Sequence, residues 1–138
     1  MVTAQQKAEL VQAAREAAEQ AYAPYSRFRV GAALLGEDGT IYRGVNVENR
    51  SYGLTICAER SAVATAVSAG GRTFLALAIY SPEHEGPLAP CGACRQVLSE
   101  FGNRELLVIM AGTRENKERL LSELLPLDML HELKDSPE

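Results

Sequence analysis

All three cysteines of this 138-residue chain lie in two short clusters, Cys57-Ala58-Glu59 and Pro90-Cys91-Gly92-Ala93-Cys94. A structural zinc site normally has four protein ligands, whereas a hydrolytic site has three and leaves the fourth position to water. Three thiols beside one carboxylate therefore predict a catalytic zinc ion bound by Cys57, Cys91 and Cys94. Glu59, two residues after the first ligand, is expected to take a proton from that water without binding the metal.

Simpler interpretations of the same residues remain open. A Cys-x-x-Cys pair alone is often a redox pair, although this would leave Cys57 and Pro90 without a role. A closed structural zinc site would need His84 or His131 as its fourth ligand. Glu59 would then only favour the start of a helix, and the protein would be a non-enzymatic, zinc-stabilised binding module.

The elements that must position these clusters can be predicted from the rest of the chain. Thr3 and Gln6 form a capping-box pattern, and helical spacing of apolar residues continues over 3–22 until Pro24 stops it. Apolar runs at 28–35 and 40–45, joined by a Gly-containing turn, predict two antiparallel strands.

The second half of the chain alternates helical and strand patterns. A helix is expected over 57–69, a buried strand over 74–80, a helix from 91 to about 101 and a strand over 106–111. This order predicts a parallel crossover, and hence a mixed sheet with helices on its faces. Leucines before Pro126 predict a last amphipathic helix, whereas a fifth strand between 111 and 120 is left open.

Both cysteine clusters begin predicted helices, so the positive ends of two helices are expected to converge on the thiolates. Three thiolates on one Zn²⁺ leave a net charge of about −1, which weakens the ion's effect on its water unless neighbours withdraw charge from sulfur. Arg60 and Arg95 stand where they could do so. We predict that Arg60 donates hydrogen bonds to the ligand sulfurs.

Length and composition predict one domain over residues 1–138. The net charge of −4 and the scattered basic residues offer no basic surface for nucleic acid. No run approaches the roughly 18 apolar residues of a membrane span, and the N-terminal residues do not resemble a signal peptide. We expect a cytoplasmic protein with reduced thiols, which binds neither nucleic acid nor a membrane.

Over residues 21 to 126 the sequence closely resembles the homotetrameric zinc-dependent cytidine deaminases. In the zinc-deaminase signature a Cys can replace the first His ligand and a non-ligand Glu shuttles protons. The resemblance implies a three-layer α/β/α sandwich around a five-stranded mixed sheet, one Zn²⁺ per subunit, and a homotetramer with shared active sites. The motifs that carry it are Phe28-Arg29-Val30-Gly31-Ala32-Ala33-Leu34, Asn46-Val47-Glu48-Asn49, Ser51-Tyr52-Gly53, Cys57-Ala58-Glu59-Arg60 and Pro90-Cys91-Gly92-Ala93-Cys94-Arg95-Gln96.

The resemblance also implies substrate contacts. Phe28 would pack against the pyrimidine, Asn46 and Glu48 would hold the ribose, and Tyr52 would come from a neighbouring subunit. Backbone groups around Ala58 and Cys91 would contact the base. Without the family, Phe28 would be read as a core residue, and Asn46 and Glu48 as turn formers.

The implied reaction is hydrolytic deamination of cytidine and 2′-deoxycytidine to the uridines, in pyrimidine salvage. Glu48 and the lack of a phosphate-binding loop favour a nucleoside over a nucleotide. The nearest alternative is a deaminase of a modified cytosine nucleoside such as blasticidin S, and polynucleotide editing would require a basic surface. Met129 stands where many family members have a Phe that reaches a neighbouring active site.

Overall fold

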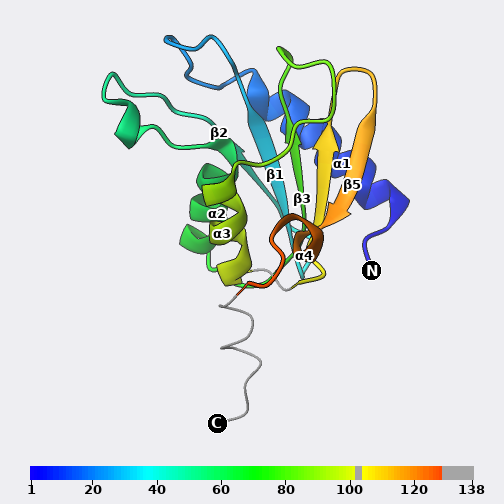
Figure 1. Cartoon of the computed structure of the whole chain (residues 1–138). Helices are drawn as coiled ribbons and strands as arrows, with labels where there is room; N and C mark the ends of the chain where they lie inside the picture. Colours follow the sequence, from blue (N-terminus) through cyan, green and yellow to red (C-terminus); the bar gives the residue numbers. More distant parts are fainter. Residues whose placement is uncertain (102–103, 129–138) are drawn as a thin grey trace.

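A five-stranded mixed sheet forms the centre of the fold in the computed structural model, which describes residues 1–101 and 104–128 (Figure 1). The strand order is β2-β1-β3-β4-β5, in which only β3 and β4 are parallel and the other pairs are antiparallel. The predicted hairpin and parallel crossover are therefore confirmed. The strands are β1 (Gly31–Gly36), β2 (Ile41–Val45), β3 (Phe74–Tyr80), β4 (Leu107–Ala111) and β5 (Asn116–Leu120).

Helices cover both faces of this sheet, which confirms the three-layer sandwich. Figure 1 shows α1 on the far side of the sheet and α2 and α3 together on the near side. Alternate residues of β1 serve the two cores: Ala33 and Leu35 pack in the cluster with α1, and Ala32 and Leu34 in the cluster with α2 and α3. The helical elements are α1 (Ala4–Ala18), η1 (Tyr52–Leu54), α2 (Ala58–Ser68), α3 (Gly92–Phe101) and α4 (Leu121–Leu124).

The first helix begins as predicted but ends early. The Thr3–Gln6 capping box is present. The helix stops at Ala18 instead of residue 22, because Tyr22 leaves it to pair with the chain after β2: Tyr22 N–H donates to Asn46 O at 3.0 Å, and Glu48 N–H donates to Tyr22 O at 2.9 Å. A tertiary backbone contact thus replaces the last helical turn.

Two other predicted elements are corrected. Strand β1 begins at Gly31 and not at residue 28, so Phe28 lies outside the sheet. The predicted amphipathic helix before Pro126 is only the four-residue α4, because residues 116–120 form the fifth strand instead. In the described part of the chain no helix is long and apolar enough to cross a membrane.

Gly44 allows α2, the helix that begins at the first cysteine cluster, to lie directly against β2. A Cβ added at Gly44 would be 2.7 Å from Ala62 Cα and closer still to Ala62 N and Ala58 O. These obstacles are helix backbone and cannot rotate away, so any larger residue must displace the whole helix.

We therefore expect Gly44→Ala to lower the free energy of unfolding by roughly 1–3 kcal/mol, the usual cost of overpacking. Thermal unfolding followed by circular dichroism measures this. Gly53→Ala is the matched control, since a Cβ there meets no atom within 4 Å. Equal melting temperatures for the two variants would contradict the close-packing argument.

Candidate active site

The three cysteines meet where two helices begin, as the sequence predicted. Cys57 is the N-cap of α2, Cys91 directly precedes α3, and Cys94 lies in the first turn of α3. The Sγ atoms of Cys57 and Cys91 are 3.8 Å apart, those of Cys91 and Cys94 are 3.0 Å apart, and all three lie within 4.8 Å of one another. All three are free thiols.

The donor set fits a zinc ion. Two sulfurs bound tetrahedrally at about 2.3 Å would be about 3.8 Å apart. The separation of Cys57 and Cys91 matches this value, and Cys91 and Cys94 lie closer, at 3.0 Å. His84 is not part of the group; its Nδ1 is 2.7 Å from Gly86 O. This argues against a closed site completed by His84, and His131 lies outside the described residues.

The pKa values of two of the cysteines depend on burial and on the neighbouring groups. Burial, reinforced by the charge of Glu59, raises the pKa of the Cys94 thiol well above its usual range. Burial also opposes ionisation of Cys91, but hydrogen bonds from Cys94 and Cys57 outweigh it and lower the pKa of Cys91. Deprotonating Cys94 therefore requires a compensating positive charge, which a bound metal would provide.

Glu59 lies in the first turn of α2, and its side chain is buried, with 4% of the residue exposed. Burial raises the pKa of its carboxyl, although hydrogen bonds from its own backbone and from Cys94 and Cys91 act in the opposite direction. A buried carboxyl of raised pKa suits a group that must both accept and return a proton.

The two nearby arginines differ in their contacts. Arg60 Nη2 donates to Cys57 Sγ at 3.7 Å and to Thr55 O at 3.2 Å, and the contact with Cys57 raises the pKa of Arg60. Arg95 instead donates to two carbonyls, Pro90 O at 3.0 Å and Leu124 O at 2.9 Å. Arg95 therefore braces the turn before Cys91, while Arg60 is the arginine that contacts a sulfur.

We expect Arg60→Ala to lower turnover about tenfold while the protein keeps its zinc, as is typical when a group that contacts a metal ligand is removed. Steady-state assay and zinc analysis of the same sample measure both quantities. Arg72→Ala is a matched control: Arg72 lies beyond the other end of α2 and donates to the carbonyls of Val67 and Gly71. Unchanged turnover in Arg60→Ala would exclude the predicted role.

Phe28 and Asn46 lie together outside the sheet. Asn46 Nδ2 donates to Phe28 O at 2.8 Å, and its Oδ1 accepts from Val30 N–H at 2.8 Å. The Phe28 ring is half-buried, belongs to neither core cluster, and meets the His84 ring edge-on with 6.3 Å between centroids. The ring is therefore not a core residue, and Asn46 holds its backbone in place.

Glu48 is also buried and bonded to the segment before Phe28. Its carboxylate accepts from the backbone N–H groups of Tyr25 and Ser26, at 3.0 and 3.1 Å, and from the Ser26 hydroxyl. The Ser26 contact lowers the pKa of Glu48, so this carboxyl is ionised at neutral pH. Asn46 and Glu48 thus shape this segment, and their contact with ribose stays a prediction.

The remaining predicted residues differ in exposure. Ala58 is fully buried at the start of α2, so only its backbone could serve a ligand. Tyr52 lies in η1, is 61% exposed, and meets the Tyr25 ring edge-on at 6.0 Å between centroids. Figure 1 shows the loop that carries η1 extending away from the sheet. Met129 lies outside the described residues.

Sequence reasoning missed one residue beside Phe28. Glu83, in the loop between β3 and α3, accepts a hydrogen bond from Arg29 N–H at 2.8 Å. No motif or periodicity marks Glu83, because its partner is 54 positions away in the chain. Only the fold brings the two segments together.

Comparisons with known proteins find one family. The family model described as "Cytidine and deoxycytidylate deaminase zinc-binding region" matches residues 4–110. A cytidine deaminase from Sporosarcina psychrophila is 52% identical over 118 residues, which cover 85% of this chain and 86% of that protein. The crystal structure of cytidine deaminase from Burkholderia pseudomallei has a TM-score of 0.83 at 48% identity, covering 87% of this chain and 96% of the other. That from Mycobacterium tuberculosis has a TM-score of 0.78 at 49% identity, covering 88% and 94%.

Proposed function

Because this chain belongs to the cytidine deaminase family, we propose that it hydrolyses cytidine and 2′-deoxycytidine to uridine and 2′-deoxyuridine with release of ammonia. The observation that carries the proposal is the buried carboxyl of Glu59 beside three converging thiols. Cys57, Cys91 and Cys94 would hold the zinc ion, and their donor chemistry matches the zinc-binding family.

When bound, zinc supplies Lewis-acid chemistry that makes water a better nucleophile near neutral pH. Glu59 takes a proton from the attacking water and delivers it to the ring nitrogen next to the carbon under attack. The oxygen forms a bond to that carbon, Glu59 passes the second proton to the amino group, and the C–N bond breaks to release ammonia. One carboxyl thus serves every proton transfer, which its burial and raised pKa favour.

The other side chains would select and orient the nucleoside. Phe28 offers an aromatic face to a flat base. Asn46 keeps one amide hydrogen and one oxygen lone pair beyond its two backbone bonds, and these remain for a ribose hydroxyl. Ionised Glu48 would disfavour a 5′-phosphate brought near it, so a free nucleoside suits the site better than a nucleotide.

We further propose a homotetramer that shares active sites and acts in the cytoplasm in pyrimidine salvage. The homotetramer is supported by a group of large apolar side chains that are exposed in the single chain, near the loop that carries η1. Burying such a group requires a partner surface, and a second copy would bring Tyr52 toward a neighbouring site. The group comprises Tyr22, Tyr25, Val47, Tyr52, Leu54 and Ile56.

The test is the change in ultraviolet absorbance when zinc-loaded protein meets cytidine, deoxycytidine, cytidine monophosphate or blasticidin S. We expect loss of the cytidine band with stoichiometric ammonia, and much slower reaction of the monophosphate. A preference for blasticidin S would favour the alternative substrate class. Light scattering on the same sample gives the mass in solution, and a monomeric mass would contradict the shared site.

A further inference from the structure

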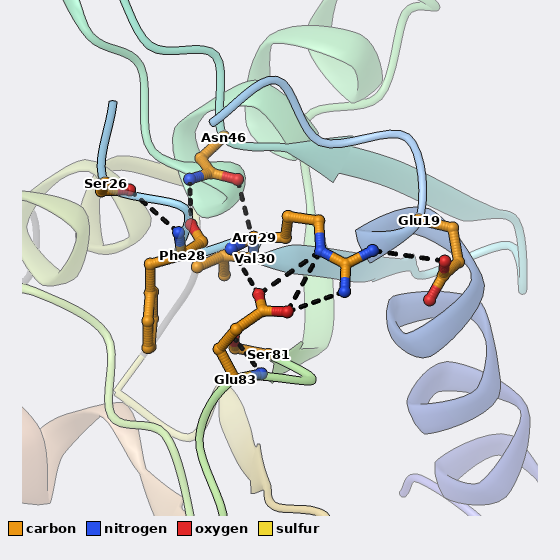
Figure 2. Close-up of polar contacts among 8 residues, drawn as sticks. All are labelled: Glu19, Ser26, Phe28, Arg29, Val30, Asn46, Ser81 and Glu83. Carbon is orange, nitrogen blue, oxygen red and sulfur yellow. Dashed lines mark hydrogen bonds and ion pairs between the residues drawn. The ribbon is translucent and has the colours of Figure 1, made fainter. Parts of the chain in front are cut away.

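The backbone N–H groups of Phe28, Arg29 and Val30 are all bonded by side chains. Residues 28–30 precede β1 and have no strand partner for their N–H groups. Phe28 N–H donates to Ser26 Oγ at 3.0 Å, and Arg29 N–H to Glu83 at 2.8 Å. Val30 N–H donates to Asn46 Oδ1 at 2.8 Å. Figure 2 shows Asn46 and Glu83 reaching the segment from different elements, with the Phe28 ring pointing away from Asn46.

Glu83 makes the most extensive of these contacts. Besides the Arg29 N–H, its carboxylate accepts from the Arg29 guanidinium, with Nη2 at 2.7 Å and Nε at 3.2 Å. Arg29 Nη1 also donates to Glu19 Oε2, beyond the end of α1, at 3.4 Å. The contacts with Arg29 lower the pKa of Glu83, so the pair is charged at neutral pH. Because both side chains are about one-third exposed, the attraction between their charges adds little to the stability of the fold. The contact matters because it fixes the position of Arg29.

The loop that carries Glu83 is itself firmly anchored. Glu83 N–H donates to the hydroxyl of Ser81, which is fully buried. On the other side, Thr113 N–H donates to Glu85 O at 3.0 Å, and a Cβ at Gly112 would lie 2.7 Å from Gly86 C. The same loop presents the His84 ring to the Phe28 ring and then continues to Cys91. It therefore links the segment that carries Phe28 to the metal ligands.

We propose that Glu83 is a positioning residue for nucleoside binding, which fixes the Phe28 ring relative to the loop that leads to Cys91 by bonding both the backbone and the guanidinium of Arg29. This inference rests on the proposed deamination of cytidine. Glu83 would act through Phe28 and not touch the substrate. Its loss should weaken binding of the base and leave the proton transfers by Glu59 largely intact.

The test compares KM and kcat for cytidine in single and double variants. We expect Glu83→Ala to raise KM about tenfold with kcat within about threefold, because binding contacts shared by ground and transition states act on KM. Glu83→Gln, which keeps an acceptor for Arg29 N–H, should recover part of the loss. In a Phe28→Leu background, Glu83→Ala should change KM by less than about twofold, because residues that act as a unit are not additive.

Glu16→Gln is the matched control, since it removes another ion pair, with Arg43 at 2.8 Å, away from Phe28. Its KM should equal that of the wild type. An unchanged KM in Glu83→Ala, or an equal Glu83 effect with and without Phe28, would overturn the positioning role while the proposed function stands. A zinc-loaded wild type that leaves cytidine unchanged would overturn the proposed function and this role with it.

Discussion

Glu59→Gln should lower turnover of cytidine by about 10²–10⁴-fold, the usual contribution of general acid–base catalysis. Glutamine has nearly the same shape as glutamate but cannot accept and return a proton. Because Glu59 is buried in the first turn of α2 and is not one of the three converging thiols, the variant should keep its fold and bind one zinc ion per chain. The measurement is kcat for cytidine together with zinc content and melting temperature.

Glu123→Gln provides a control for this variant. Glu123 also lies in the first turn of a helix, α4, where it accepts a hydrogen bond from Leu120 N–H. Its replacement should leave kcat unchanged, which separates a general effect of removing a helix-start carboxylate from a loss of proton transfer. Turnover of Glu59→Gln within tenfold of the wild type would exclude Glu59 as the proton shuttle.

Elements whose evidence is local were predicted well from the sequence. Strand β3 spans residues 74–80 as expected, because its apolar residues form one continuous run. Helix α2 ends with Ala69 as its C-cap, and the following Gly70 has the positive φ of 96° that favours glycine after a helix. The convergence of the three cysteines also followed from the sequence, since both clusters begin helices.

The resemblance implied a five-stranded sheet, but the residue pattern alone left the fifth strand open, because its sequence lacks an apolar face. Residues Asn116–Leu120 are mostly polar and exposed, and they form an edge strand held by pairing with β4 and by the Lys7–Glu118 ion pair at 2.9 Å. An edge strand with charged side chains is typical, because charge discourages pairing with another molecule. Pairing with β4, and not the sequence pattern of residues 116–120, makes this segment a strand.

In the segment before β1, the sequence pattern predicts a strand that the structure does not have. Phe28, Arg29 and Val30 continue the apolar pattern of the strand, which is why a strand was predicted from residue 28. Their N–H groups are instead bonded by Ser26, Glu83 and Asn46. Side chains that include Glu83 and Asn46, from distant parts of the chain, thus override the local preference and keep the ring of Phe28 outside the core clusters.

Removing one of the three proposed zinc ligands should also have a large effect on cytidine turnover. We expect Cys94→Ala to lose its bound zinc and to reduce cytidine turnover to the background of the assay, because two thiols are too few to hold the ion in a three-ligand site. Cys94 is the most buried of the three cysteines and lies in the first turn of α3.

Stability gives a readout of this loss that does not depend on turnover. A ligand that binds only the folded state stabilises it by about 2.7 kcal/mol when its free concentration is 100 times its Kd. A chelator should therefore lower the melting temperature of the wild type and leave that of Cys94→Ala unchanged. Ser99→Ala removes a buried side-chain oxygen from the same helix and should keep both zinc and the chelator response. Wild-type zinc content in Cys94→Ala would mean that the ion is held elsewhere, and the site built from the two helix starts would be wrong.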